Sequence, residues 1–187
     1  MTLSLTDQIV GLHEHFSRAN ISHAFGGALA LAFCTAEPRG TKDIDVNVFV
    51  DVGGVDDVIA ALPAAVSATD AAVGQLRADG QARLFWDTTP IDIFLSTHPF
   101  HDHAESSHRT VPFAGLMHLP VLACADLAVF KSFFARPKDG VDLTAMVTAG
   151  AIDLIAVERT VATLLGDTAS RQGFFDRIRL DLSRASS

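Results

Sequence analysis

The sequence is poor in cysteine, with only Cys34 and Cys124 among 187 residues. Disulfide-rich scaffolds and structural zinc sites need more sulfur ligands than this, so neither is expected. Both cysteines lie in apolar segments with helical character, where a small buried thiol is the ordinary interpretation. We therefore expect two free thiols inside the protein.

Long hydrophobic runs and a secretory leader are also lacking. The most apolar later segment, Gly115 to Phe130, contains His118, Pro120 and Asp126 and is shorter than the roughly 20 residues that span a bilayer. The N-terminus shows no basic start followed by an apolar core and a cleavage site. No membrane association is expected, and the predicted location is cytoplasmic.

Basic residues are in the minority, with 14 Lys and Arg against 22 Asp and Glu, which gives a formal net charge of −8. A broad basic surface that neutralises many phosphates is therefore not expected, and large nucleic acids are not favoured as partners by overall charge. Nucleotides held through metal ions stay compatible with this charge, because a bound cation reverses the local sign.

No internal repeat is visible, and a composition of 49% hydrophobic and 19% charged residues is typical of an ordered globular protein. Hydrophobic periodicity predicts helices at Thr6 to Arg18 with Thr6 as cap, Gly27 to Thr35, Val55 to Ala65, Ala125 to Ala135, Val141 to Thr148, Asp153 to Leu165 and Ser170 to Leu182. Strands are predicted at Ile21 to Phe25, Ile44 to Val50, Gln81 to Trp86, Ile91 to Leu95 and Pro112 to Met117. The stretch His98 to Arg109 is predicted to be a polar loop.

This order of elements predicts an α/β (α+β) fold, in which a mixed β-sheet core is flanked by helices and followed by a helical extension. The strands at Gln81 to Trp86 and Ile91 to Leu95 are expected to form a hairpin around a turn at residues 87–89. We expect a core of residues 1–118 and a C-terminal helical region of residues 119–187.

Two acidic residues, Asp43 and Asp45, flank Ile44 at the start of a predicted strand. Residues two apart in a strand point to the same face, so both carboxylates would converge on one point. Divalent cations, which prefer oxygen ligands, are the simplest way to sustain such a pair. For the pair alone, a solvated strand face is the alternative.

A third acid, Asp92, is the lone charge in the apolar strand Ile91 to Leu95. Acids are rarely buried without a partner. If this strand lies beside the first, Asp92 completes a cluster of three carboxylates able to hold two metal ions roughly 4 Å apart. An edge-strand charge that discourages aggregation is the alternative.

Gly26 and Gly27 open a predicted helix rich in Ala and Leu. Unpaired amides and the helix dipole favour an anion there, and the missing side chains let a phosphate approach closely. A phosphate cradle and a metal cluster on adjoining elements indicate phosphoryl or nucleotidyl transfer.

A Gly-Gly, a helix and an acid-apolar-acid strand follow one another in segments 25–30 (FGGALA) and 41–46 (TKDIDV). In this order the sequence resembles the nucleotidyltransferase superfamily that includes DNA polymerase β. Segment 131–142 (KSFFARPKDGVD) is similar to a pattern that small bacterial members often carry after the core. The resemblance is closest to nucleotidyltransferase toxins of toxin–antitoxin systems and to aminoglycoside and lincosamide nucleotidyltransferases, and it covers about Phe25 to Met146.

The resemblance implies that Asp43, Asp45 and Asp92 are catalytic and bind Mg²⁺ or Mn²⁺, with Asp92 also helping to withdraw a proton from the acceptor. It further implies nucleotide-binding residues that hold the triphosphate through main-chain amides or positive side chains, namely Gly26, Gly27, Arg39, Lys42, Lys131 and Lys138. For Lys131 the alternative is a stem extended over an apolar surface, and for Asp139 and Asp142 it is a helix cap with an ion pair.

The predicted activity is transfer of a nucleoside monophosphate from a nucleoside triphosphate, ATP among them, to a hydroxyl acceptor. Transfer RNA or a protein, with a cognate antitoxin protein as partner, would fit the toxin-like relatives. A small cationic molecule such as an aminoglycoside would suit the acidic charge. A catalytically silent nucleotide-binding or interaction module of the same fold is the alternative from another class.

Four histidines, His98, His101, His103 and His108, invite a second metal-site hypothesis because imidazole is a common metal ligand. They share no fixed helical spacing and have no accompanying thiol or glutamate pattern. Surface histidines are therefore the preferred interpretation.

Overall fold

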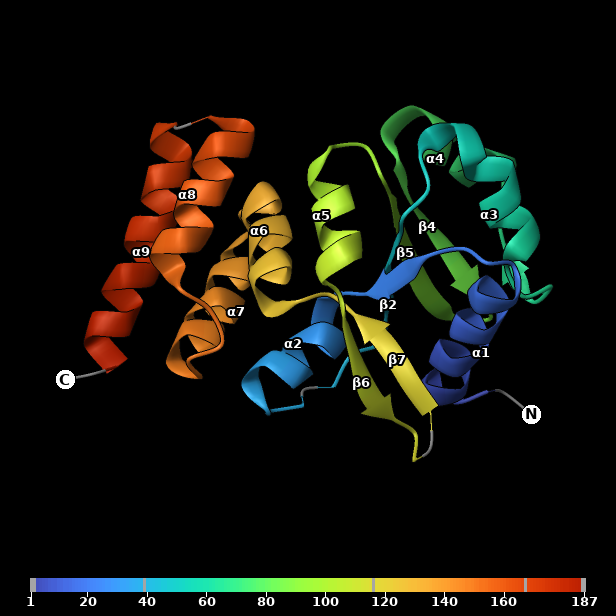
Figure 1. The fold of residues 1–187 in the computed structure, drawn as a ribbon, viewed down its shortest axis with the longest axis horizontal. Helices are drawn as coiled ribbons and strands as arrows, with labels where there is room; N and C mark the ends of the chain where they lie inside the picture. The colour runs from blue at the N-terminus through green and yellow to red at the C-terminus, as the bar shows by residue number, and fades with distance from the viewer. Residues whose placement is uncertain (1–2, 39, 116, 167, 186–187) are drawn as a thin grey trace. The chain divides into compact units, whose positions relative to one another are not determined.

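The computed structural model describes residues 3–38, 40–115, 117–166 and 168–185 (Figure 1). The chain forms two compact units, one made of Met1–Leu29 and Arg39–Leu122 and the other of Ala30–Pro38 and Ala123–Ser187. Within the described residues, no helix has both the length and the apolar character that crossing a membrane requires.

The first unit is built on one mixed sheet with the strand order β3-β4-β5-β2-β1-β7-β6. Its strands are β1 (His23–Phe25), β2 (Ile44–Val48), β3 (Val66–Ser67), β4 (Gln81–Trp86), β5 (Thr89–Leu95), β6 (Arg109–Phe113) and β7 (Met117–Val121). Strand β2 runs parallel to β5 and antiparallel to β1. The predicted mixed sheet flanked by helices is confirmed.

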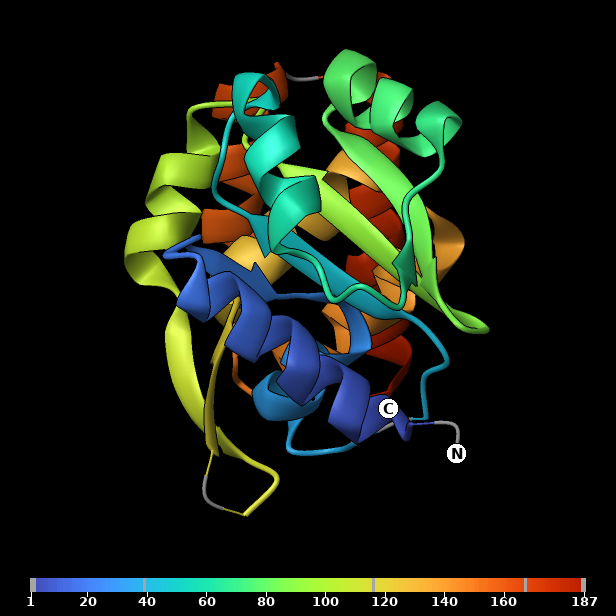
Figure 2. The ribbon, with the colours of Figure 1, turned by 90° about the vertical axis from the view of Figure 1, so that its right-hand side faces the viewer.

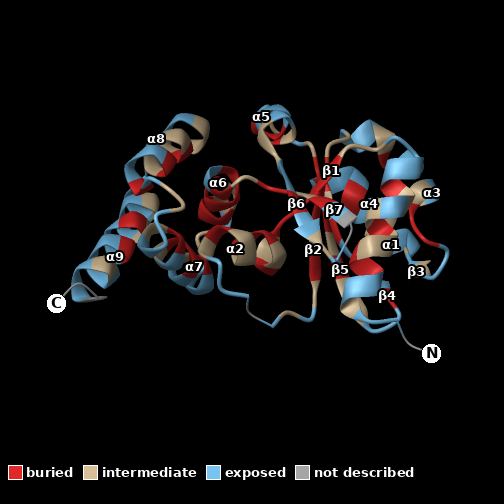
Figure 3. Cartoon of the chain, turned by 60° about the horizontal axis from the view of Figure 1, so that its bottom comes forward, coloured by how far each residue is buried: buried red, intermediate tan, exposed pale blue. Residues whose placement is uncertain are grey.

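Helices α1 (Leu5–Arg18), α3 (Val55–Ala61) and α4 (Asp70–Asp79) belong to the same unit, and a short 3-10 turn, η1 (Val52–Gly54), precedes α3. Figure 2 shows α1 and α3 over one face of the sheet. Ile9, Leu12 and Phe16 are buried on α1, and the Gln8 side chain donates to the carbonyl of Trp86 on β4 at 3.2 Å. The alternating apolar side chains of the strands meet this layer, and Figure 3 shows the central strands largely buried.

The N-terminal cap of α1 differs from the prediction. Ser4, not Thr6, accepts from the backbone N–H of Asp7 at 3.1 Å, and the Asp7 carboxylate accepts from the N–H of Ser4 at 3.1 Å. This reciprocal capping box places the cap two residues earlier than predicted, so Thr6 lies inside the first turn.

Several further elements differ from the prediction, among them α3, which ends at Ala61 and not at Ala65, and β3, which has no predicted counterpart. Residues 98–109 are not a loop, because they contain helix α5 (Phe100–Ser107), and α4 has no predicted counterpart. The single strand expected at Pro112 to Met117 is instead a hairpin of β6 and β7, visible at the lower left of Figure 2.

The second unit holds α6 (Cys124–Phe134), α7 (Pro137–Thr148), α8 (Leu154–Leu165) and α9 (Ala169–Ala185), which confirms the predicted C-terminal helices. Helix α2 (Gly27–Thr35) begins in the first unit and contributes its later turns to the second. It has the bounds that its Ala- and Leu-rich sequence predicts.

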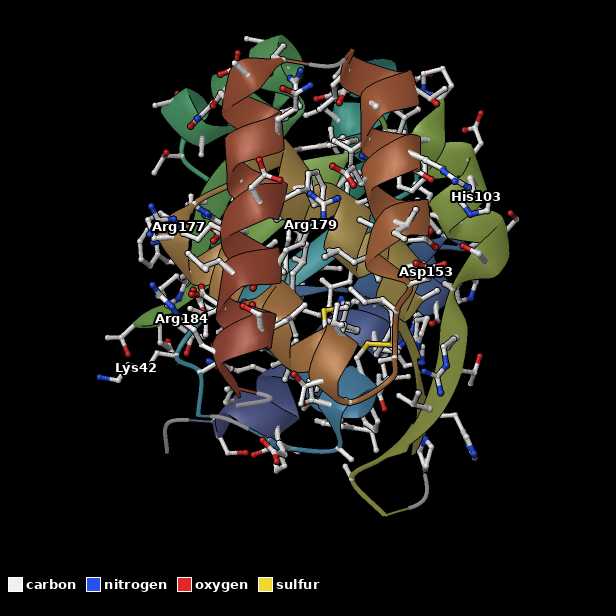
Figure 4. All side chains as sticks on the ribbon, turned by 90° about the vertical axis from the view of Figure 1, so that its left-hand side faces the viewer. Lys42, His103, Asp153, Arg177, Arg179 and Arg184 are labelled. Carbon is white, nitrogen blue, oxygen red and sulfur yellow. A yellow bond between two sulfur atoms is a disulfide. The ribbon has the colours of Figure 1, made fainter. Side chains whose placement is uncertain are left out.

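The prediction of two free thiols is wrong, because Cys34 and Cys124 form a disulfide (Figure 4). The two Cα atoms lie 5.7 Å apart although 90 residues separate the cysteines in the sequence. The bond joins α2 to the first residue of α6 and closes a long loop, which restricts the unfolded chain. Sequence spacing carries no signal for a pair this distant.

A histidine in the core makes the stability of the first unit sensitive to pH. His23 on β1 is 5% exposed, and its Nε2 lies 3.0 Å from His13 Nδ1 on α1. The pKa of His23 is lowered from 6.5 to about 4, first by burial and to a smaller extent by the nearby His13 and His108, against the opposing effect of the Ile21 carbonyl. The folded protein therefore keeps this ring neutral where the unfolded chain protonates it.

We expect the free energy of unfolding to fall as pH drops below about 6.5, with His23 accounting for a loss of about 2 kcal/mol between pH 7 and pH 5. Urea unfolding at both pH values checks this. In His23→Phe the loss should shrink by most of that amount, while in His103→Gln, at an exposed position of α5, it should stay as in the wild type. An unchanged loss in His23→Phe would contradict the assignment.

Candidate functional site

The predicted phosphate cradle lies where β1 ends and α2 begins. The N–H of Gly26 donates to the carbonyl of Asp45 at 2.9 Å, and the N–H of Leu122 donates to the carbonyl of Phe25 at 2.9 Å, so the turn is tied to the sheet on both sides. The Gly26 amide is therefore used within the sheet. The first amides of a helix have no partner inside it, so those at the start of α2 are the ones that a phosphate would need.

Gly27 brings this helix start against the first acidic strand. Its φ is +51°, a conformation that favours glycine, and a Cβ atom at this position would lie 1.8 Å from Oδ2 of Asp45. The Asp45 carboxylate thus occupies the space that any other side chain at residue 27 would fill. The missing side chain places a carboxylate directly beside the helix N-terminus.

The two acidic strands lie side by side, as the sequence interpretation required. Asp45 on β2 and Asp92 on β5 are paired in the parallel register, so both side chains point to the same face. Asp43 precedes β2, and its Oδ1 accepts a hydrogen bond from the hydroxyl of Thr41. The apolar neighbours Ile44 and Ile91 are buried on the other face.

Sequence reasoning missed Arg83 on β4, which contacts this cluster through Asp92. Its Nε and Nη2 donate to Oδ1 and Oδ2 of Asp92, both at 2.7 Å. A signal for this pair was present in the sequence. A two-residue turn at Asp87 and Thr88 pairs Trp86 with Thr89, and counting back along both strands sets Arg83 opposite Asp92, as the structure shows.

Arg83 lies in the field of all three acids. Its pKa is raised above the ordinary value first by the hydrogen bonds with Asp92, then by the attraction of that carboxylate, and to a smaller extent by Asp43 and Asp45. A guanidinium therefore already offsets part of the negative charge that a divalent cation would offset.

The donor set fits Mg²⁺ or Mn²⁺, because carboxylate oxygens are the ligands that these ions prefer. In the described part of the chain, however, no group of three His, Cys, Asp or Glu side chains is arranged as a metal centre, and Arg83 holds both oxygens of Asp92. Asp45 and Asp92 would hold the ion together with Asp43 once Arg83 turns away.

The positive side chains predicted to bind phosphate differ in their exposure to solvent. Lys42 and Lys138 are exposed, and Figure 4 shows Lys42 pointing outward. Lys131 is only 8% exposed, and its Nζ lies 2.6 Å from Oδ2 of Asp142 and 3.6 Å from Oδ1 of Asp139. Arg39 lies outside the described residues.

The contacts of Asp139 and Asp142 agree with their predicted alternative, a helix cap with an ion pair. Asp139 accepts from the backbone N–H of Arg136 at 3.1 Å and from its Nε at 2.7 Å, so it caps α7. Together with Lys131 and Asp142 this makes a buried ion-pair network between α6 and α7, inside the second unit.

The prediction that the histidines of residues 98–108 lie at the surface is wrong for His101. His101 on α5 is 6% exposed, and its Nδ1 lies 3.0 Å from the carbonyl of His98. Phe100, His101 and Ala104 form the buried side of α5, while His103 is exposed. Burial lowers the pKa of His101, which favours the neutral ring. These contacts give His101 a role in packing α5.

Comparison with known proteins gives structural neighbours only, since no family model and no curated protein matches the sequence. The crystal structure of an antigenic nucleotidyltransferase-like protein from Paracoccidioides brasiliensis superposes with a TM-score of 0.51 at 15% identity, over 97% of this chain and 91% of that chain. The antibiotic-resistance factor ANT(2'')-Ia gives a TM-score of 0.49 at 12% identity, over 100% and 97% of the two chains. JHP933 from Helicobacter pylori gives 0.44 at 12% identity, over 96% and 92%.

Proposed function

We propose that this chain, which has the nucleotidyltransferase fold, transfers a nucleoside monophosphate from a nucleoside triphosphate to a hydroxyl acceptor. One observation carries the proposal: Asp45 is in register with Asp92 and at the same time packs against Gly27 at the start of α2. Carboxylates that suit a divalent cation and a helix N-terminus that suits a phosphate thus adjoin each other.

In this mechanism the first turn of α2 orients the triphosphate through its amides, and Asp43, Asp45 and Asp92 hold Mg²⁺ or Mn²⁺. The bound ions supply charge neutralisation at the transferred phosphoryl group and at the leaving pyrophosphate. Asp92 points to the same face of the sheet as Asp45, and its carboxylate accepts the proton of the attacking hydroxyl. Lys42, exposed next to Asp43, neutralises outer phosphate oxygens.

The acceptor is proposed from chemistry alone. Transfer RNA or a protein side chain offers a hydroxyl, and a toxin with a cognate antitoxin partner would use either. A small cationic molecule such as an aminoglycoside would be attracted by the net charge of −8. The two classes differ in size and charge, so one transfer assay separates them.

A second candidate function is a nucleotide-binding or interaction module without catalysis. It is favoured by the ion pair between Arg83 and Asp92, in which a permanently charged guanidinium nitrogen, Nη2, lies 2.7 Å from Oδ2 of Asp92. Such a charge lowers the need of the acids for a metal ion. This module would bind a triphosphate without releasing pyrophosphate.

The cytoplasmic location stays a prediction, and the disulfide between Cys34 and Cys124 weighs against it. Disulfides persist in oxidising compartments and are rare in the reducing cytosol. Thiol labelling of the protein in freshly lysed cells would show which state the cysteines have where the protein is made.

The proposal is tested by label transfer from each of four α-labelled triphosphates into total RNA, total protein and a panel of aminoglycosides, with Mg²⁺ or Mn²⁺. We expect label in one acceptor class, none after chelation of the metal, and pyrophosphate released in equal amount. Thermal stabilisation by metal and triphosphate without any transfer would favour the silent module. Absence of both transfer and stabilisation would contradict both functions.

A further inference from the structure

Arg83 forms the most specific polar contact of the candidate site. Both of its hydrogen bonds to Asp92 are 2.7 Å long and they use two different nitrogens, Nε and Nη2. This two-pronged geometry makes an arginine–carboxylate pair stronger than a single contact. The Arg83 side chain is 52% exposed and that of Asp92 is 20% exposed, so Arg83 is able to swing away without opening the core.

Arg83 occupies the carboxylate of Asp92, one of the three acids of the candidate site. Asp92 contacts its guanidinium directly, and Asp45 lies next to Asp92 in the parallel register. Asp43 directly precedes β2, two residues before Asp45. A divalent ion at this cluster would need the same Asp92 oxygens that Arg83 now occupies, so ion and guanidinium compete for them.

A guanidinium displaced from Asp92 has a second partner in the proposed reaction. Its planar fork matches the oxygens of a phosphate as well as those of a carboxylate. The triphosphate would lie at the start of α2, and Gly27 there contacts Asp45, the register neighbour of Asp92. The phosphates therefore come within the surroundings of Arg83 on the same face of the sheet.

We propose that Arg83 serves the site twice: it occupies the cation position among Asp43, Asp45 and Asp92 before the substrate binds, and it turns to the triphosphate when a divalent ion takes the carboxylates. This inference rests on the proposed function. It makes Arg83 a substrate-binding residue that also lowers the affinity of the empty site for metal. A metal ion alone is bound weakly, and the ion with its nucleotide is bound well.

A merely structural Arg83 would behave differently. Cross-strand ion pairs on a sheet contribute little to stability, and half-exposed pairs contribute least. If Arg83 only joined β4 to β5, its removal would change stability slightly and leave the affinity for metal unchanged or reduced.

The test measures two dissociation constants in wild type, Arg83→Gln and the control Arg77→Gln. Arg77 is a suitable control because it also pairs with an aspartate, Asp56, and its side chain is likewise 52% exposed. The first constant is that of Mn²⁺ alone, read from the paramagnetic resonance signal of the free ion. The second is that of a non-hydrolysable triphosphate at saturating Mn²⁺, read by calorimetry.

For Arg83→Gln we expect Mn²⁺ alone to bind at least about tenfold more tightly, since a neighbouring arginine lowers the proton affinity of an aspartate by about 1 to 3 decades and opposes a metal cation through the same charge. The triphosphate should bind about tenfold more weakly, through the loss of a charge-assisted contact. Arg77→Gln should change neither constant. Unchanged or weaker Mn²⁺ binding in Arg83→Gln would overturn the inference, and so would unchanged triphosphate binding.

The same experiment separates this inference from the proposed function. If wild type and Arg83→Gln bind Mn²⁺ equally well, the metal site stands and only the competition by Arg83 is wrong. If neither protein binds Mn²⁺ at millimolar concentration, with or without the triphosphate, the proposed metal-dependent activity fails along with the inference. Circular dichroism of each variant confirms that the sheet is intact.

Discussion

Replacing Asp45 by asparagine is expected to lower nucleotidyl transfer by about 100- to 1000-fold and to leave the fold intact. Asparagine has nearly the shape of aspartate, so the contact with Gly27 and the pairing of β2 with β5 are retained. The amide has no negative charge to offer a divalent cation. The metal ligand beside the helix N-terminus is lost, and the transferred phosphoryl group loses its alignment.

Initial rates of label incorporation measure this effect, with Asp87→Asn as the matched control. Asp87 lies in the turn between β4 and β5, is exposed, and has a φ of +53° that asparagine tolerates well. Both variants remove one negative charge from the same unit. A rate for Asp45→Asn within tenfold of the Asp87→Asn rate would contradict the assignment of Asp45 as a metal ligand.

The acidic strands could be predicted from the sequence because their signals are local. The alternation of polar and apolar residues along the strand predicts the face to which Asp45 points. Asp92 is noticeable because it is the lone acid among apolar residues. The same logic reaches Arg83 once the hairpin turn is read as two residues long, since register then follows by counting. Counting the register in this way needs only the sequence. Without it, Arg83 was not predicted to lie opposite Asp92.

Helices α4 and α5 were missed for a different reason. Leu76 is the one buried residue of α4, and α5 buries only Phe100, His101 and Ala104. So few buried residues give almost no helical periodicity in the sequence. Most helix stability in proteins comes from tertiary packing, which the sequence pattern does not show. For α4 the ends were informative, because Thr69 caps its start and Gly80 at its end has a φ of +68°.

The disulfide and the buried ion pairs of the second unit could not be predicted from local sequence patterns. Nothing in the sequence around Cys34 indicates Cys124, and a lysine in a helix gives no sign of whether it is buried. Lys131 was therefore assigned to phosphate by resemblance, whereas the structure surrounds it with Asp139 and Asp142. Which of these roles Lys131 fills is decided by a stability measurement.

Replacing Lys131 by methionine is expected to lower the free energy of unfolding by about 3 to 5 kcal/mol. Methionine fills a similar volume, but it leaves the carboxylate of Asp142, which is 2% exposed, without the ammonium now 2.6 Å away. Asp139 keeps its hydrogen bonds with Arg136. The cost therefore comes mainly from one buried, poorly compensated charge, and urea unfolding at pH 7 measures it.

The double variant Lys131→Met with Asp142→Leu distinguishes charge burial from loss of packing. A buried ion pair replaced as a whole by apolar side chains is often neutral in stability, so most of the loss should be recovered. Lys138→Met, at an exposed position at the start of α7, should cost little by comparison. If Lys131→Met instead keeps full stability and weakens triphosphate binding, then Lys131 leaves its ion pairs to reach the nucleotide, and the role implied by the family resemblance is the right one.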